Sequence, residues 1–525
     1  MSLATTVTLA DGSVRGTAVS VDGVEVRRFL GIPYAGSPAG ARRFLPPVPV
    51  PGWAGVLDCS VAGPAAPQNP ETPAPPGRKP RTWSESDCLN LNVGAPSTGG
   101  GELPVMVWIH GGAYLSGSGS DGMYDGANLA GATGTVVVTI NYRLGALGLL
   151  HLAELLGPEY ADSSNLALLD QLEALRWVRK NVAGFGGDPE SVTIFGESAG
   201  AAAVGTLLGI PASTGLFRRA IMQSGTAERY RSAGDSSRIS LEFLELCGLD
   251  PAGAGELLTL PVERLLEAQE KLDQRAGAET YAVSLPFKPT VGTPSLPVPP
   301  LEAVRNGLNA EVDLLIGTNL NEGSFAVEMR PKNPAEPSHE GRAASLLAEA
   351  GALGREVEYA QALTSALGGE PSGKRLLEAA ISDVVYRQPS NRLLDARQGS
   401  AGKTFSYLFT WRSPAMGGKL GACHALDVPF VFRQLGSSEA EFLTRGRSPQ
   451  SLGDMMSTAW AAFAGTGQPA AAGLPGWPAY GPGRRTMILD ELPRLEADPR
   501  QELREFWVDE PAYEARPSPG QHAQT

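Results

Sequence analysis

The sequence lacks the features that would place the protein at a membrane, outside the cell or on nucleic acid. No run of about 18 apolar residues occurs, and the N-terminal stretch MSLATTVTLADGSVRG has no basic segment followed by an apolar one. Positive charge is also scarce. The 43 Lys and Arg residues against 56 Asp and Glu residues give a net charge of −13, which disfavours binding to phosphate backbones and anionic lipids. We predict a cytoplasmic protein without nucleic-acid or membrane partners, and no pattern indicates an oligomeric state.

Cysteine is scarce too. The four cysteines, Cys59, Cys88, Cys247 and Cys423, are widely spaced and form no C-x-x-C pair. This spacing indicates neither a zinc site nor a disulfide framework. We predict four reduced, mostly buried thiols and no bound metal.

Glycine and proline, by contrast, are abundant. The 525 residues include 64 glycines and 43 prolines, about a fifth of the chain. This share stays below the roughly 25–30% that is typical of low-complexity disorder. A loop-rich globular protein with a large buried core is expected.

Short apolar runs bounded by turn residues recur along the chain. They lie at 103–110, 134–143, 191–196, 218–225, 313–319 and 404–411. Near-continuous runs of this kind are typical of strands buried on both faces. Helical patterns lie between several of them, the clearest at 165–185. Alternating strands and helices predict an α/β fold with a large, mostly parallel twisted sheet and helices on both faces.

Two longer tracts with helical patterns interrupt this alternation, at about 226–305 and 325–400. We interpret them as insertions at strand ends, because the carboxyl ends of parallel strands carry the active site and insertions there form its walls. The chain is therefore expected to form a single domain over residues 1–515, followed by a disordered tail at 516–525.

The sequence VTIFGESAGA, residues 192–201, contains the one G-x-S-x-G motif of the chain. A strand pattern precedes Ser198 and a helix pattern follows it, so Gly196 and Gly200 flank a serine on a sharp strand-to-helix turn. This arrangement is typical of a nucleophile elbow. The elbow also places the serine at a helix N-terminus, which favours a developing oxyanion. The alternative is a tight turn with an inert serine.

A serine hydroxyl needs a general base, and histidine is the usual one. The chain has five histidines: His110, His151, His339, His424 and His522. In folds with a nucleophile elbow, the acid and then the base follow the serine along the chain. The base must therefore be one of the three histidines after Ser198. His522 lies in the tail and His339 in a polar stretch of an insertion. His424 follows the apolar run at 404–411 and a glycine-containing loop, so it is the candidate base.

The acid must hold the imidazole in the correct tautomer and stabilise the imidazolium. Glu322, in LLIGTNLNEGSF, directly follows a predicted strand and is the candidate. Asp313, Asp383 and Asp395 lie at the start of a strand or in the insertions, where solubilising carboxylates are common. Asp427 is near the histidine in sequence but has the wrong place in the chain order.

The loop HGGAYLSGSGS follows the run at 103–110 and offers backbone N–H donors for an oxyanion. Gly111 and Gly112 permit a close approach of the backbone, and the N–H of Ala199, directly after the serine, is a further donor. Phosphate binding is the alternative for a glycine-rich loop, but neither G-x-x-x-x-G-K-[ST] nor G-x-G-x-x-G is present here. We also expect Tyr114, Leu115 and Phe325 to line the pocket.

With these residues assembled, the chain resembles the type-B carboxylesterase family of the α/β-hydrolase fold, which includes bacterial p-nitrobenzyl esterases and cholinesterases. The motifs that carry the resemblance span nearly the whole chain: FLGIPYA, SDCLNLNV, VWIHGGAYLSG, INYRLGALG, VTIFGESAGA, IMQSG, GTNLNEGSF, GACHALDVPFVF and WAAFAGTGQP. The resemblance implies Ser198 as nucleophile, Glu322 as acid and His424 as base.

The resemblance also implies an oxyanion hole made by the N–H groups of Gly112, Ala113 and Ala199. It places Glu197 beside the nucleophile and Ser224, with Gly111, around the site. No organic cofactor is implied, and the implied partner is a small-molecule ester.

The chain departs from the family pattern in two places. Arg43 matches the family arginine that pairs with an acidic residue just before the D-C-L motif. In this chain Ser86 occupies the position of that acidic residue, so the sequence leaves open whether the ion pair forms. Glu85 is the neighbouring carboxylate. Cys88 has no partner cysteine in GPAAPQ.

The resemblance implies hydrolysis of esters with small to medium acyl groups. An amidase or carbamate hydrolase, or a non-catalytic adhesion-type protein of the same fold, are the alternatives.

Overall fold

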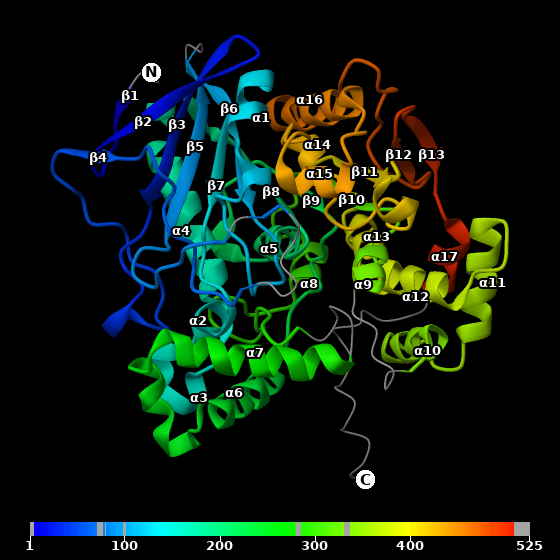
Figure 1. Cartoon of the computed structure of the whole chain (residues 1–525), viewed down its shortest axis with the longest axis horizontal. Helices are drawn as coiled ribbons and strands as arrows, with labels where there is room; N and C mark the ends of the chain where they lie inside the picture. Colours follow the sequence, from blue (N-terminus) through cyan, green and yellow to red (C-terminus); the bar gives the residue numbers. More distant parts are fainter. Residues whose placement is uncertain are drawn as a thin grey trace.

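The computed structural model describes residues 5–70, 77–78, 80–97, 101–279, 285–329 and 337–508. Within these ranges thirteen strands build one sheet, with helices around it (Figure 1). The strands are β1 Thr5–Thr8, β2 Ser13–Val21, β3 Val24–Pro33, β4 Val56–Asp58, β5 Asn90–Pro96, β6 Leu103–Ile109, β7 Val136–Ile140, β8 Gly187–Glu197, β9 Arg219–Gln223, β10 Asp313–Asn319, β11 Thr404–Phe409, β12 Arg485–Leu489 and β13 Arg494–Ala497. The predicted tail at 516–525 lies outside the described residues.

The α-helices lie mainly between strands and in the two long tracts. They are α1 Ala127–Thr133, α2 Gly145–Leu149, α3 Ala153–Leu156, α4 Leu166–Asn181, α5 Ala199–Leu208, α6 Ala233–Cys247, α7 Val262–Glu279, α8 Pro300–Arg305, α9 Ser324–Met329, α10 His339–Glu349, α11 Glu356–Leu367, α12 Gly373–Ile381, α13 Gln388–Ala396, α14 Val428–Val431, α15 Ser438–Thr444, α16 Gln450–Thr466 and α17 Gln501–Phe506. A π-helical turn, Ser382–Arg387, joins α12 to α13.

The strand order is β1-β2-β3-β5-β7-β6-β8-β9-β10-β11-β12-β13, with β4 paired to β2. From β7 through β12 all neighbours are parallel. Strands β1, β2, β3 and β5 and the last strand, β13, add antiparallel edges, whereas β4 pairs with β2 in parallel. All six predicted strands are present, and the predicted α/β fold with a mostly parallel sheet is confirmed.

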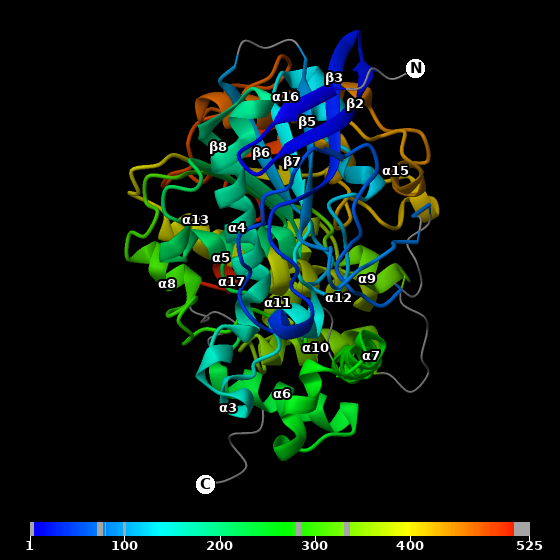
Figure 2. The ribbon, with the colours of Figure 1, turned by 90° about the vertical axis from the view of Figure 1, so that its left-hand side faces the viewer.

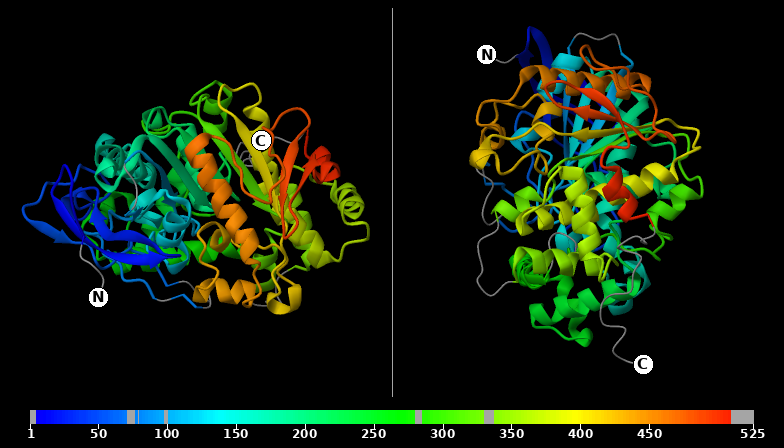
Figure 3. Two further views of the ribbon diagram at one scale, coloured as in Figure 1. Left: turned by 90° about the horizontal axis from the view of Figure 1, so that it is seen from above. Right: turned by 90° about the vertical axis from the view of Figure 1, so that its right-hand side faces the viewer.

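Side chains of the central strands alternate between two cores, one on each face of the sheet. In β6, Val105, Val107 and Ile109 belong to one core, whereas Met106 and Trp108 belong to the other. Helices α4, α5 and α8 cover the first face, and α1, α14 and α16 cover the second. Figures 2 and 3 show helices on both sides of the sheet. Burial on both faces explains why these strands read as continuous apolar runs.

The two long tracts are helical, as the sequence indicated. The tract at 226–305 contains α6, α7 and α8, and the tract at 325–400 contains most of α9 and all of α10 to α13. Helices α9 to α12 share a small core of their own with Leu503, Phe506 and Trp507 from the end of the chain. In Figure 1 the red helix α17 lies beside α11 and α12. The assignment of residues 1–515 to one domain stays a prediction.

The ion pair that the sequence left open is present. Arg43 binds Glu85 through two hydrogen bonds, Nε to Oε1 at 2.6 Å and Nη2 to Oε2 at 2.8 Å. Its Nη1 atom also donates to the carbonyls of Leu257 and Leu260, in the first long tract. Glu85 thus takes the place of the acidic residue that is missing at Ser86.

In the part of the chain that the structure describes, no helix combines the length and the apolar composition needed to cross a bilayer. The same residues hold no group of three or more His, Cys, Asp or Glu side chains that could bind a metal ion. All four cysteines are free and buried.

Replacing Asp170 with asparagine is expected to lower the free energy of unfolding by about 3–5 kcal/mol, because it leaves a buried guanidinium without its counter-charge. Asp170 is fully buried and accepts hydrogen bonds from the backbone N, Nε and Nη2 of Arg143 at 3.0, 2.8 and 2.7 Å. The matched control is Glu190→Gln, which breaks the exposed pair with Arg179 and is expected to cost less than about 1 kcal/mol. Urea unfolding measures both, and equal losses would contradict the account.

Candidate active site

Ser198 occupies a strained turn between β8 and α5. Its φ of 56° and ψ of −123° lie outside the regions that ordinary residues prefer. The flanking glycines are required by space: a Cβ on Gly196 would lie 2.6 Å from the backbone carbon of Gly200, and a Cβ on Gly200 would collide with the carbonyl oxygen of Ile109. The structure therefore contains the sharp strand-to-helix turn that the G-x-S-x-G motif indicated, with Ser198 at the start of α5.

His424 and Glu322 lie side by side, although 102 residues separate them. Nδ1 of His424 lies 2.7 Å from Oε2 of Glu322, which is 2% exposed. The second carboxylate oxygen of Glu322 accepts from the Ser224 hydroxyl at 2.5 Å and from the Asn319 N–H at 2.6 Å. Both oxygens are thus held, and the carboxylate fixes the orientation of the imidazole ring.

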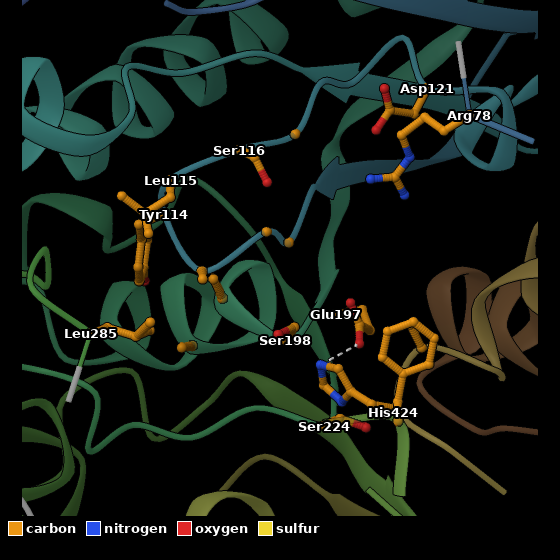
Figure 4. Close-up of a pocket in the computed structure, with 18 of the residues that line it drawn as sticks. Arg78, Tyr114, Leu115, Ser116, Asp121, Glu197, Ser198, Ser224, Leu285 and His424 are labelled. Carbon is orange, nitrogen blue, oxygen red and sulfur yellow. Dashed lines mark ion pairs between the residues drawn. The ribbon is translucent and has the colours of Figure 1, made fainter. Parts of the chain in front are cut away.

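The other nitrogen of His424 faces a second carboxylate. Its Nε2 atom lies 3.1 Å from Oε1 of Glu197, which directly precedes Ser198 (Figure 4). Among the described residues no hydrogen bond joins the Ser198 hydroxyl to the imidazole, although both side chains line the same cavity. The structure thus brings Ser198 and His424 to one cavity, with Glu322 bonded to the imidazole.

The two carboxylates change the acid–base behaviour of the site. Burial alone would lower the pKa of His424, but Glu197 and Glu322 outweigh it and raise the pKa well above that of a free imidazole. Burial raises the pKa of Glu197 to about 8, against the opposing effect of His424. The charged carboxylate thus favours the protonated imidazole, and the imidazolium favours the charged carboxylate.

The glycine-rich loop after β6 borders the same cavity. Gly112, Ala113 and Tyr114 all have positive φ values, of 106°, 58° and 59°. Gly111, Gly112, Ala113 and Ala199 line the cavity, and no described hydrogen bond uses the N–H groups of Gly112, Ala113 or Ala199. These three N–H groups are thus available to an acceptor beside Ser198.

The cavity has a volume of about 750 Å³, within the range of small-molecule sites. Tyr114, Leu115 and Phe325 line it, as the sequence predicted. Two ion pairs line the cavity: Arg78 pairs with Glu439, and Arg81 pairs with Asp121. Figure 4 labels Arg78 and Asp121. Gln269, Leu285 and Tyr386 also contribute, so both long tracts supply walls of the cavity.

Two buried residues near the site, Tyr386 and Asp427, were not predicted from the sequence. The ring of Tyr386 packs on that of His424 with centroids 4.6 Å apart. Asp427, set aside because of its place in the chain order, is fully buried and accepts hydrogen bonds from Gln223, Asn319 and Tyr407. Its burial could be suspected from the apolar stretch that surrounds it, but its partners come from β9, β10 and β11 and only the fold brings them together.

Comparison with known proteins shows the family of the chain. The model of the carboxylesterase family matches residues 3–507. The chain belongs to the carboxylesterase family. The resemblance drawn from the motifs is confirmed, and the enzyme is a carboxylic ester hydrolase.

Several characterised carboxylesterases are similar in sequence. The para-nitrobenzyl esterase of Bacillus subtilis is 36% identical over 514 residues, which cover 95% of this chain and 97% of that protein. The fumonisin B1 esterase of Sphingopyxis macrogoltabida is 34% identical, over 88% of this chain and 83% of that protein. The phenmedipham hydrolase of Pseudarthrobacter oxydans is 32% identical, over 87% of this chain and 90% of that protein.

Solved carboxylesterase structures share the fold. A thermophilic PNB esterase superposes with a TM-score of 0.81 at 34% identity, covering 95% of this chain and 99% of that one. A carboxylesterase from Geobacillus stearothermophilus gives 0.82 at 34% identity, over 96% and 100% of the chains. The α/β-hydrolase fold that the resemblance implied is thereby confirmed.

Proposed function

We propose that this carboxylesterase is a serine hydrolase in which Ser198 is the nucleophile, His424 the general base and Glu322 the acid that orients the base. The observation that carries the proposal is the 2.7 Å bond between Glu322 and His424 at the cavity that contains the strained Ser198 turn. A base oriented by a buried carboxylate, at a cavity that also contains a partly exposed elbow serine, is the arrangement that acyl transfer requires.

The reaction proceeds in two steps. His424 takes the hydroxyl proton as Ser198 Oγ attacks the ester carbonyl, and the oxyanion accepts hydrogen bonds from the N–H groups of Gly112, Ala113 and Ala199. The proton on His424 then passes to the leaving alcohol, which leaves an acyl-enzyme. Water attacks this ester with the same base, and Ser198 regains its proton as the acid departs.

The apolar part of the cavity wall favours esters with small to medium acyl groups. The similarity to a phenmedipham hydrolase adds carbamates as a second substrate class, and amides remain the other alternative for the same residues. All three residues of the proposed triad are present, which argues against a non-catalytic adhesion-type protein. A cytoplasmic location stays a prediction.

A substrate panel tests the proposal. Purified protein is assayed with p-nitrophenyl acetate, butyrate and octanoate, with butyryl p-nitroanilide and with a p-nitrophenyl carbamate. We expect the short esters to be hydrolysed fastest. Faster turnover of the anilide or the carbamate than of butyrate would reassign the substrate class, and the absence of any hydrolysis would contradict the proposal.

The pH dependence of kcat/KM is expected to shift when Glu197 becomes glutamine. The base acts as neutral imidazole, so kcat/KM falls as pH drops through the raised pKa of His424. Loss of the negative charge 3.1 Å from Nε2 lowers this pKa, so the acid limb should move to lower pH. The exposed Glu190→Gln variant should leave the limb in place. An unmoved limb in Glu197→Gln, or one moved to higher pH, would refute the assignment of the base.

Replacing Gly112 with alanine is expected to lower kcat by about 10²–10³-fold, because it displaces an oxyanion donor. The residue has a φ of 106°, and an added Cβ would collide with the carbonyl oxygen of Ser116. Gly122→Ala is the control, since nothing lies within 4 Å of a Cβ there. Steady-state kinetics with p-nitrophenyl butyrate separates the two variants, and similar kcat values would count against the donor role.

A further inference from the structure

A second, much smaller cavity lies away from Ser198, and none of its lining residues borders the larger one. Residues of β10, β11 and β12 form one wall, and α13 together with the segment before α17 forms the other. Its volume is about 40 Å³. Three of the residues that line it are arginines: Arg387, Arg484 and Arg500.

One of these three guanidiniums, that of Arg500, forms no ion pair with another described residue. Asp498 also lines the cavity, but it is held by three hydrogen bonds from Arg504. Within the described ranges no hydrogen bond or ion pair is formed by the guanidinium of Arg500. The ion pairs around the cavity are Arg387–Asp383, Arg484–Asp395 and Arg504–Asp498. Arg504 also pairs with Glu505 at 3.5 Å, so Arg500 is the one guanidinium of these four that forms no ion pair among the described residues.

Two guanidinium donors at this cavity are also unsatisfied. The Nε atoms of Arg387 and Arg500 are both buried and have no acceptor among the described residues. A buried donor without a partner is destabilising, and more so when it is charged, so native proteins rarely leave one unpaired. Burial and the charge of Arg387 lower the pKa of Arg500 to about 10, against the opposing effect of Asp383. Arg500 is also held in a left-handed conformation, with a φ of 63°.

We propose that this cavity binds a small inorganic anion of the size of chloride, held by the guanidiniums of Arg387 and Arg500. An anion there would neutralise the remaining positive charge and accept from donors that otherwise have no acceptor. One water needs about 10–15 Å³ of such space, so about 40 Å³ holds a chloride ion with a water but excludes a large organic anion.

The site adjoins the loop that carries Glu322. Nη2 of Arg387 donates to the carbonyls of Asn319, at 2.9 Å, and Leu320, at 3.2 Å. The anion would therefore bind an arginine that also holds this loop.

Thermal unfolding in sodium chloride, against sodium gluconate at equal sodium concentration, tests the proposal. Ligand that binds the folded state alone raises Tm, and a tenfold excess over Kd should give about 1–3 °C for a chain of this size. We expect a saturable, chloride-specific rise in Tm in the wild-type protein and in the Arg494→Gln variant. Arg494 is an exposed residue of β13 that pairs with Glu496, so it serves as the control. The rise should be absent in Arg500→Gln. No chloride-specific rise, or an equal rise in all three proteins, would overturn the proposal.

Bromide provides a test that needs no variant. Crystals of the wild-type protein soaked in sodium bromide should show an anomalous peak within hydrogen-bond distance of the guanidiniums of Arg387 and Arg500. Bromide peaks found only elsewhere on the protein would overturn the proposal even if Arg500→Gln fails to fold.

Discussion

Replacing Ser198 with alanine is expected to lower kcat for p-nitrophenyl butyrate by about 10⁶-fold, the loss seen when a serine hydrolase loses its nucleophile. The alanine has no oxygen to form the acyl-enzyme, while the cavity and the oxyanion donors remain. Substrate binding should therefore change little, and the loss should fall almost entirely on kcat.

The control for this variant is Ser191→Ala, near the start of the same strand β8, which should keep wild-type kcat. Circular dichroism and the unfolding midpoint of both variants should match wild type. A Ser198→Ala protein that folds normally and retains most of its kcat would refute Ser198 as the nucleophile.

The second large effect is expected for Glu322→Gln, with a loss of about 10⁴-fold in kcat. The glutamine amide can turn an N–H group toward Nδ1 of His424, which favours the tautomer whose proton lies on Nε2 and faces the serine. A base in that tautomer cannot accept the serine proton. The hydrogen bonds from Ser224 and Asn319 to the other oxygen are preserved, so the loss should reflect the tautomer and not the fold.

The exposed Glu190→Gln substitution is the isosteric control for Glu322→Gln, and rescue is the stricter test. Glu322→Asp keeps the carboxylate but shortens it, so it should recover part of the activity that the glutamine loses. A Glu322→Gln enzyme as active as wild type, or an aspartate variant no better than glutamine, would remove Glu322 from the proposed triad.

The sequence predicted the parallel centre of the fold because burial on both faces leaves a clear pattern. The run that became β6 is apolar throughout, the run at 191–196 in β8 is mostly apolar, and the turn after β8 requires two glycines. The edge strands leave a weaker pattern. Strand β2 alternates buried and partly exposed residues, and β13 has no fully buried residue, so the antiparallel edges could not be predicted with the same argument.

The sequence also indicated which residues meet at the cavity, because the candidate serine and acid follow buried strands and the histidine follows β11 and a glycine-containing loop. It could not indicate the orientation of their side chains. The imidazole of His424 contacts Tyr386, from the π-helical turn, and Glu197, and the contact with Tyr386 depends on the packing of the second long tract. The pair of Arg43 with Glu85 was open for a similar reason, since either neighbouring position could have faced the arginine.

The most direct test of the central claim is covalent labelling with diethyl p-nitrophenyl phosphate, which phosphorylates an activated serine. Intact mass spectrometry counts the adducts per chain, and peptide mapping finds the modified residue while esterase activity is followed in parallel. The account predicts one adduct, on Ser198, formed in proportion to the loss of activity and absent from the His424→Ala variant. Complete inactivation with the adduct on another residue, or an unlabelled Ser198 in an inactivated enzyme, would contradict it.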